Sequence, residues 1–164
     1  MNITFAPKGI LQIDDARIKF RNFSGTADKF TREGDRSFCL VIPDTETYDM
    51  LVNDTNKYGV GWNIKVKPPR EEGETPRMHL KVKVKFTDFG PNVYLKTGEK
   101  INKLDEESIS ILDKISMTDV SLDIRPYDDE VQGKPFRAAY LHGMVVTQNV
   151  DRFAAMYENY EDEE

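Results

Sequence analysis

The sequence of 164 residues has few of the side chains that form covalent links or bind metals. Its single cysteine, Cys39, excludes an intramolecular disulfide and a cysteine-rich zinc site. Its two histidines, His79 and His142, leave few ligands for a metalloenzyme. No apolar run approaches the roughly 18 residues of a membrane span, and no basic stretch followed by an apolar one indicates a secretory signal. We therefore expect one cytoplasmic domain that needs no metal or other cofactor and contacts no membrane.

The sequence also lacks the motifs of phosphate binding and catalysis. Gly98-Glu99-Lys100 is without the upstream glycine and the following Ser or Thr of a Walker loop, and Gly59-Val60-Gly61 is without the third glycine of a dinucleotide fingerprint. Adjacent acids such as Asp14-Asp15 and Asp128-Asp129 point apart on an extended chain, so they are poor metal clamps. The sequence therefore predicts a protein that is not an enzyme.

Charge is distributed unevenly along the chain, which has 29 acidic and 23 basic residues and a net charge of -6. Residues 151–164 hold six acids and one base, a net of -5, which leaves 23 acids and 22 bases, a net of -1, in the other 150 residues. Such a like-charged terminal block does not fold on itself and acts as a solvated or interacting tail. The sequence thus predicts a nearly neutral domain over residues 1–150 and an acidic tail over residues 151–164. A tail that serves solubility alone is the open alternative.

Alternation of apolar and polar residues dominates the domain and predicts β-strands. In the clearest case, residues 78–86, five apolar residues at even positions alternate with His79 and three lysines. Further strands are predicted around residues 16–21, 37–42, 62–68, 92–97, 120–127 and 135–147. The last two strands are expected to form a long hairpin with a loop over residues 128–134, which contains Gln132-Gly133.

Two short helices fit between these strands. Asp44 is placed to cap a helix that reaches about Asn53, and Asp105 is placed to cap a second helix. In the second, the apolar residues Ile109, Leu112 and Ile115 are spaced for burial. Several short strands with two helices and no βαβ alternation predict a mainly β fold, either a small barrel or a sandwich.

The polar faces of the predicted strands carry an excess of positive charge. They hold ten bases and two acids, Asp119 and Asp123, which gives +8 in a domain whose total is -1. By the two-residue period of a strand, Phe23, Tyr94 and Tyr127 fall on the same faces, whereas Trp62 falls with the core residues. The ten bases are Arg17, Lys19, Arg21, Lys65, Lys67, Lys81, Lys83, Lys85, Lys96 and Arg125.

A surface of this composition suits a flexible polyanion that also presents flat rings. Lysine and arginine neutralise phosphates, exposed aromatic side chains stack on bases, and a β-barrel offers a curved surface for both. Duplex readers tend to present a basic helix, and neither predicted helix is basic. The residues therefore favour single-stranded nucleic acid as the partner. The alternative is that the lysines only discourage edge-to-edge aggregation of strands, in a structural or protein-interaction domain without nucleic-acid binding.

Six segments carry a resemblance to known proteins: residues 18–25, 34–38, 61–65, 81–86, 90–95 and 124–127. Together, over roughly residues 15–147, they resemble the family of tailed-bacteriophage single-stranded DNA-binding proteins. The resemblance implies an OB-fold core and sequence-tolerant binding of single-stranded DNA during phage DNA replication or recombination in the host cytoplasm. It also implies an acidic C-terminus that recruits replication proteins. The chain stops at Glu163-Glu164 instead of the Pro-Phe ending of the cellular type, so recruitment through that motif is not expected.

The resemblance also adds candidate DNA contacts to the ten basic residues and Tyr127 given above. The two-residue period of a strand supports Arg21, Phe23 and Tyr94. It disagrees for Trp62, which it assigns to the core. Within the acidic tail, the aromatic and terminal acidic residues are expected to bind partner proteins. The DNA contacts implied by the resemblance are Arg21, Phe23, Arg36, Phe38, Trp62 and Tyr94. The partner-binding residues of the tail are Phe153, Tyr157, Tyr160, Glu161, Asp162, Glu163 and Glu164.

The combined prediction is a non-enzymatic single-stranded DNA-binding protein. Its fold is an OB-like closed or partly open β-barrel with two short helices and a long C-terminal hairpin. The hairpin could embrace DNA or the second subunit of a homodimer, and an annealing recombinase would in addition need ring or filament assembly. The acidic tail is expected to compete with DNA for the basic surface, or to recruit phage replication or recombination proteins.

Overall fold

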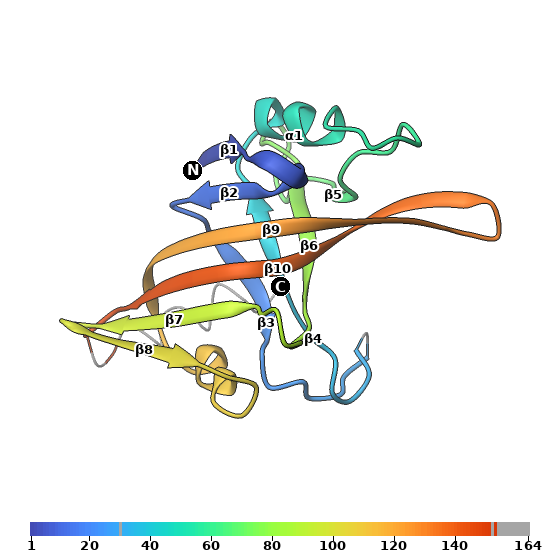
Figure 1. Ribbon diagram of the computed structural model, residues 1–164. Coiled ribbons are helices and arrows are strands. Elements are labelled where there is room, and N and C mark those ends of the chain that lie inside the picture. Colours follow the sequence, from blue (N-terminus) through green and yellow to red (C-terminus); the bar gives the residue numbers. More distant parts are fainter. Residues whose placement is uncertain (30, 152, 154–164) are drawn as a thin grey trace.

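The computed structural model describes residues 1–29, 31–151 and 153. Within these ranges the chain is mainly β, with ten strands, one α-helix and two short 3-10 helices (Figure 1). No helix in this part of the chain is long and apolar enough to cross a membrane. The strands are β1 (Asn2–Phe5), β2 (Leu11–Asp14), β3 (Ile18–Asn22), β4 (Arg36–Ile42), β5 (Ile64–Lys67), β6 (Arg77–Val84), β7 (Asn92–Thr97), β8 (Lys100–Leu104), β9 (Met117–Val131) and β10 (Lys134–Gln148). The helical elements are η1 (Pro7–Gly9), α1 (Thr45–Val52) and η2 (Ile109–Asp113).

All ten strands belong to one sheet. Its hydrogen-bonded order is β1-β2-β9-β10-β6-β4-β3, with β5 added to β6, β7 added to β10 and β8 added to β7. β1 and β3, the two ends of this path, do not pair with each other within the described residues, so the sheet does not close. Figure 1 shows β9 and β10 running across the whole molecule, with β4 and β6 crossing them steeply and β7 and β8 at one side. The predicted mainly β fold is confirmed, and the closed form of the barrel is wrong.

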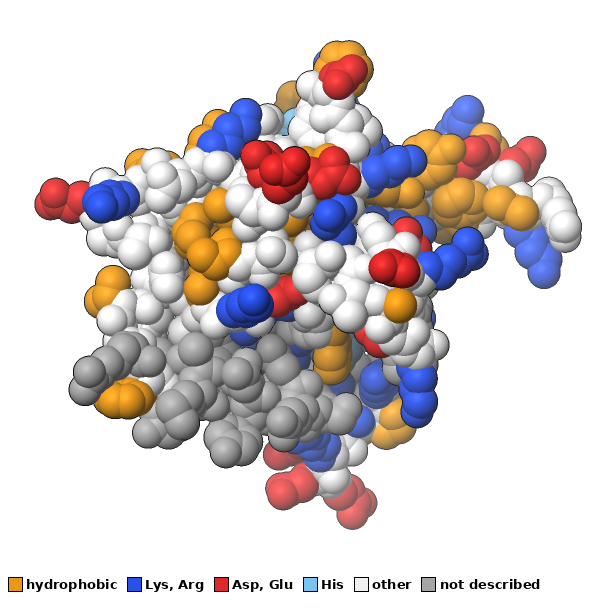
Figure 2. Space-filling view, turned by 90° about the horizontal axis from the view of Figure 1, so that it is seen from below, with side chains coloured by type: hydrophobic (Ala, Val, Ile, Leu, Met, Phe, Trp, Pro, Cys, Tyr) orange, Lys and Arg blue, Asp and Glu red, His pale blue; other side chains and the backbone are white. Residues whose placement is uncertain are grey.

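The long hairpin of β9 and β10 projects from the body at its far end (Figures 1 and 2). Strand pairing continues to Val131 and Lys134, so only Gln132 and Gly133 form the turn. Their φ angles of 53° and 78° are the left-handed pair that a two-residue turn of type I′ requires. The predicted hairpin is confirmed, but the predicted seven-residue loop is wrong, because the strands remain paired to the turn. We call the projecting end, residues 127–137, the arm.

The predicted first helix is confirmed as α1. The backbone N–H of Thr47 donates to the Asp44 carboxylate at 2.7 Å, the hydrogen bond of a helix N-cap. On its inner side Leu51 is fully buried. The helix covers one end of the sheet, above β5 and β6 in Figure 1.

The predicted second helix is wrong as an α-helix. The Asp105 carboxylate accepts from the backbone N–H groups of Glu107 at 3.0 Å and Ser108 at 2.9 Å, which makes a tight turn. The chain then forms only the five-residue 3-10 helix η2. Ile109 and Leu112 are nevertheless fully buried, as their spacing predicted, because a short 3-10 turn is enough to point both side chains at the core.

A β-bulge interrupts β3 and determines which of its side chains are buried. β3 pairs with β4 at Lys19 and next at Asn22, which leaves Phe20 and Arg21 opposite a single residue of β4. Phe20 takes a positive φ of 53°. An extra residue reverses the in-and-out alternation of a strand beyond it. Lys19 therefore keeps the orientation of the outer face, although it is only 9% exposed, while Phe23 enters the core and is fully buried.

Candidate nucleic-acid interface

Strand register brings basic side chains from separate strands to the outer face of the sheet. On the central strand β6, His79 is only 7% exposed and pairs with Lys65 of β5, and Lys83 pairs with Tyr140 of β10. Tyr140 pairs in turn with Arg125 of β9. Cross-strand partners share one face of a sheet, so these side chains lie on a common surface. We call this surface the basic face, and its cations are Lys65, Lys67, Lys81, Lys83, Lys85 and Arg125.

The lysines of the basic face are exposed, and among the described residues none of them has a carboxylate within 4.0 Å. Their convergence is visible at Cys39 of β4. Burial raises the pKa of the Cys39 thiol, and the positive charges of Lys81, Lys65 and Lys67 act in the opposite direction. Three ammonium groups from β5 and β6 thus lie close enough to affect one side chain of β4. The basic face is a concentration of uncompensated positive charge.

Aromatic rings lie between these cations. The guanidinium carbon of Arg125 is 4.9 Å from the ring centroid of Tyr140, and the ammonium nitrogen of Lys83 is 5.9 Å from it. The Tyr127 ring lies 6.0 Å from Tyr140 and 6.1 Å from Phe136. Rings and cations in alternation offer stacking to bases and neutralisation to phosphates on the same surface.

Four hollows follow the outer face of β6. Hollows of about 610 Å³ and 460 Å³ share Lys81 and Lys83 in their linings. One of about 500 Å³ lies at the His79 end of the strand, and one of about 220 Å³ lies beyond the other end, between Lys85 and Arg125. We call this row of hollows the groove. The smallest hollow shares Lys85 with the one of about 460 Å³, and the hollow at the His79 end shares no lining residue with the other three.

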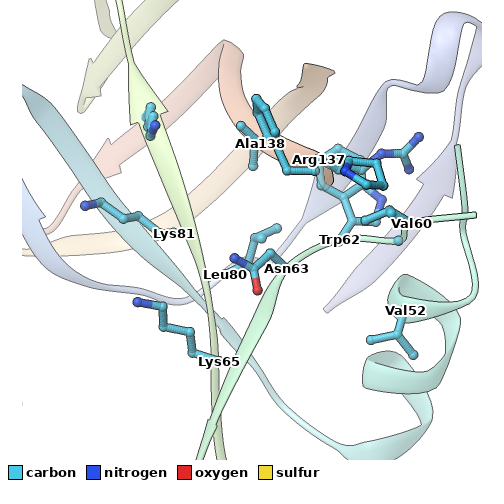
Figure 3. Close-up of a pocket in the computed structure, with 14 residues that line it drawn as sticks. Val52, Val60, Trp62, Asn63, Lys65, Leu80, Lys81, Arg137 and Ala138 are labelled. Atoms are coloured by element: carbon cyan, nitrogen blue, oxygen red, sulfur yellow. The ribbon is translucent and has the colours of Figure 1, made fainter. Parts of the chain in front are cut away.

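The largest hollow lies where the sheet divides. β4 pairs along one edge of β6, and β5 and β10 share the other edge. On this second edge β5 pairs with β6 as far as Leu80, and β10 pairs with β6 from Val82 onward. Lys81 lies at this fork, from which the two strands diverge. We call the hollow between them the cleft. Figure 3 shows Lys65 and Lys81 on one side of it and Trp62 on the other.

A buried network fixes the arm beside the cleft. Arg137 is 8% exposed, and its guanidinium donates to the Asp128 carboxylate at 2.8 and 3.1 Å and to the Asp54 carbonyl at 2.6 Å. The Trp62 indole N–H donates to the Asp54 carboxylate at 2.9 Å, and the Arg137 guanidinium lies 5.0 Å from the indole ring. Hydrogen bonding from Arg137 lowers the pKa of Asp128 against the opposing effect of burial. Arg137 therefore joins the arm to the loop before β5 and is not available to a phosphate.

Three predicted contacts lie in the scaffold of the interface. Phe23 and Phe38 are fully buried and stack on each other, with ring centroids 5.4 Å apart. Arg21 donates to the backbone carbonyls of Leu112 at 3.0 Å and Ile115 at 2.7 Å. The prediction that Arg21 and Phe23 share the basic face is wrong, because the bulge in β3 reverses the alternation before these residues.

Trp62 is 2% exposed, so its assignment to the core by parity is confirmed. Arg36 is half-buried in the lining of the groove. It donates from Nε to the Phe23 carbonyl at 3.0 Å and forms an ion pair with Glu106 at 3.5 Å. Its charge is therefore partly used within the protein.

The remaining predicted cations and rings lie at two ends of the outer face. Arg17 and Lys19 line the hollow at the His79 end of the groove. Tyr94 and Lys96 belong to β7, which pairs with the other half of β10, and they line none of the four hollows described above. The two predicted acids of the outer face, Asp119 and Asp123, also pair with that half of β10. The structure thus brings Arg17 and Lys19 to the groove and leaves Tyr94 and Lys96 apart from it.

Three aromatic residues of this surface were not predicted. Phe136 and Tyr140 lie in β10, a strand whose sequence is mostly apolar. Their signal was the alternation of residues 136, 138, 140 and 142 against the buried residues between them. Phe20 joins the face through the bulge, where it contacts His79 at 5.5 Å between ring centroids and lies 5.9 Å from the Lys67 ammonium. A bulge has no simple sequence signal, and strict alternation with Arg17, Lys19 and Arg21 would place Phe20 in the core.

Other predicted features lie outside this surface. Among the described residues no group of three or more His, Cys, Asp or Glu side chains could hold a metal ion. Of the predicted partner-binding residues of the tail, Phe153 is 50% exposed. The others, from Tyr157 to Glu164, lie outside the described residues.

Comparison with known proteins identifies solved structures of similar fold and the family of the chain. The solved structure of the single-stranded DNA-binding protein from bacteriophage Enc34 in complex with ssDNA superposes with a TM-score of 0.55 at 16% identity, over 93% of each chain. A second solved structure, of the single-stranded DNA-binding protein from bacteriophage Enc34, gives a TM-score of 0.55 at 15% identity, over 90% of this chain and 86% of the other. No curated protein matches at a significant level. The family model described as "Putative phage ssDNA-binding domain" matches residues 3–162. Since that match spans nearly the whole chain, the protein belongs to the phage single-stranded DNA-binding domain family.

Proposed function

We propose that this protein binds single-stranded DNA without sequence preference in the groove. The strand would follow β6, with its phosphates on the basic face and its bases against Tyr140, Tyr127 and Phe20. The observation that supports this most strongly is the convergence of uncompensated lysines from β5 and β6, with Arg125 from β9, on one hollowed surface. Arg17 and Lys19 line the hollow at one end of the same path, and Arg36 lines the hollow of about 460 Å³ within it.

Several features favour a single strand over a duplex. The exposed ring of Tyr127 and the half-buried rings of Tyr140 and Phe20 offer stacking, which an unpaired base accepts and a paired base inside a duplex does not. The one α-helix of the described residues carries Glu46 and Asp49 and no basic residue, so it is unsuited to a major groove. The similar protein from phage Enc34 was solved in complex with ssDNA, which supports the same ligand class here. Binding rather than catalysis is the function that we propose.

We interpret the fold as an OB-like, partly open barrel that forms a domain over residues 1–150. In this view the curved sheet provides the rigid surface on which the cations and rings are arranged. The exposed side chains of Tyr127 and Val131 on the arm, 45% and 60% exposed, are then available to DNA or to a second copy of the chain.

The acidic tail, residues 151–164, is proposed to regulate this surface. Its net charge of -5 is opposite to that of the basic face, and tethering gives it a high effective concentration there. DNA would displace the tail, which would then be free to recruit phage replication or recombination proteins in the host cytoplasm.

The test is a titration of the intact protein with a dT oligomer across a range of salt concentrations. If the six cations of the basic face each neutralise one phosphate, the logarithm of the binding constant should fall against the logarithm of the salt concentration with a slope of about -4. Binding weaker than micromolar at low salt, or a slope near zero, would count against the proposal.

A further inference from the structure

The cleft is a built site as well as a widening of the groove. At the fork of the sheet, Asn63 approaches Lys81 from the β5 side and Ala138 approaches it from the β10 side. These three side chains belong to the outer face, whereas Trp62, Leu80 and Ala139 alternate inward and are at most 3% exposed. The cleft therefore has an apolar floor, two strand walls and a lysine at its fork.

The charged side chains that line the cleft are all of one sign. Lys65, Lys81 and Lys83 line it, and no Asp or Glu appears among the described residues of its lining. The hollows on either side of it along β6, in contrast, include Asp15 and Glu74 or Asp35 and Glu106. The fourth cation of the cleft, Arg137, is already bound to Asp128 and Asp54. The cleft thus presents phosphate-binding groups at its rim beside an apolar interior.

We infer that the cleft holds one unstacked nucleobase of the bound strand, with the flanking phosphates on Lys65, Lys81 and Lys83. This inference rests on the proposed function and adds a specific base pocket to it. The volume of about 610 Å³ lies within the range of about 300–1,000 Å³ found for small-ligand pockets. The walls supply one side-chain amide, Asn63, which can both donate and accept a hydrogen bond. Such a pocket accepts any base, in keeping with binding that tolerates all sequences.

Trp62 reports on this pocket alone, since it is the only tryptophan of the chain and lies in the floor of the cleft. We expect binding of a dT oligomer to the full-length protein to quench tryptophan emission. An oligomer of the same length made entirely of abasic nucleotides should bind through its phosphates with little or no quenching. Thymidine monophosphate alone should not quench at micromolar concentration, because it lacks the neighbouring phosphates. Saturable quenching by the mononucleotide would overturn the inference, since the cleft would then be a site for free nucleotides.

Two variants fill the cleft from opposite walls. In Ala138→Ile the added side chain enters from β10, and in Asn63→Ile it enters from the β5 side, at an exposed position that tolerates substitution. Each should weaken dT binding by about tenfold, the contribution of one stacked base, and should remove most of the tryptophan quenching. Affinity for the abasic oligomer should change little, so the ratio of the two affinities should fall. Ser121→Ile is the matched control, because Ser121 lies on the outer face of β9 opposite Val145 and lines none of the four hollows.

The outcomes separate this inference from the proposed function. If the wild-type protein binds dT in fluorescence anisotropy but both cleft variants retain its affinity and its quenching, the cleft holds no base, and the groove alone binds the strand. An equal loss of affinity for dT and for the abasic oligomer would also overturn the inference, because it would indicate a structural effect. If the wild-type protein binds neither oligomer, the proposed function itself fails.

Discussion

The double variant Lys81→Gln/Lys83→Gln tests the basic face at its centre. Both side chains are exposed and have no carboxylate partner among the described residues, so their replacement should change the free energy of unfolding by less than about 0.5 kcal/mol. They line both the cleft and the neighbouring hollow of about 460 Å³. Loss of two phosphate contacts should reduce the slope of log affinity against log salt by about 1.4, from about -4 to about -3.

The size of the effect follows from the same relation. A single-strand contact with a coefficient of about 0.7 contributes about a fivefold increase in affinity at 0.1 M salt and about a threefold increase at 0.2 M. The double variant should therefore bind a dT oligomer about 25-fold more weakly at 0.1 M salt and about tenfold more weakly at 0.2 M. Fluorescence anisotropy with a labelled oligomer at several salt concentrations measures both the slope and the affinities.

A control variant with the same change in net charge isolates position from charge. Lys100→Gln/Lys114→Gln removes two exposed lysines that line none of the four hollows. It should retain the slope of the wild-type protein and lose little affinity, apart from a small long-range effect. An equal loss in the two double variants would refute the reasoning, because binding would then depend on overall charge and not on the basic face.

Three further predictions concern the aromatic residues, the buried network and the tail. Tyr140→Ala removes the ring between Arg125 and Lys83 and should weaken dT binding by about 1–3 kcal/mol, measured by anisotropy, with unchanged salt slope; a changed slope at unchanged affinity would contradict its stacking role. Arg137→Met leaves the Asp128 carboxylate without its main partner and should lower the free energy of unfolding in urea by about 3 kcal/mol. Because the pKa of Asp128 is lowered in the folded protein, its contribution to stability is present above its unfolded pKa of about 3.9 and is lost as the pH falls below that value. The Arg137 variant should therefore lose less stability than the wild-type protein over this pH range. Equal losses in the two proteins would contradict the role of Arg137 as the main partner of Asp128. Deletion of residues 151–164 should tighten dT binding at low salt, and this gain should disappear at high salt; unchanged or weaker affinity would rule out competition by the tail.

The basic face could be predicted because its central strand is regular. The lysines of residues 78–86 keep strict alternation, β5 has the same pattern, and the structure places both sets on one surface. The same parity assigned Trp62 correctly to the core, against the assignment implied by family resemblance. Alternation is a reliable guide where nothing interrupts the ladder, because the side-chain period of a strand is two.

Other parts of the site depend on features that a single sequence does not specify. The bulge in β3 moves Phe20 outward and Phe23 inward, since one extra residue reverses every side chain beyond it. In β10 both faces carry apolar residues, so the outward position of Tyr140 emerges only from its pairing with Lys83 and Arg125. The fork that creates the cleft forms because β5 and β10, which are far apart in the sequence, share one edge of β6. This arrangement is a property of the sheet topology and has no local sequence pattern.

The account depends most on where the DNA lies, and lysine protection measures this directly. Acetylation of the intact protein with a limited amount of reagent, with and without a saturating dT oligomer, followed by peptide mass spectrometry, gives the reactivity of each lysine. We expect DNA to protect Lys65, Lys67, Lys81, Lys83 and Lys85 and to leave Lys100 and Lys114 as reactive as in the free protein. Protection that is equal at all lysines, or that is confined to those outside the basic face, would contradict the account.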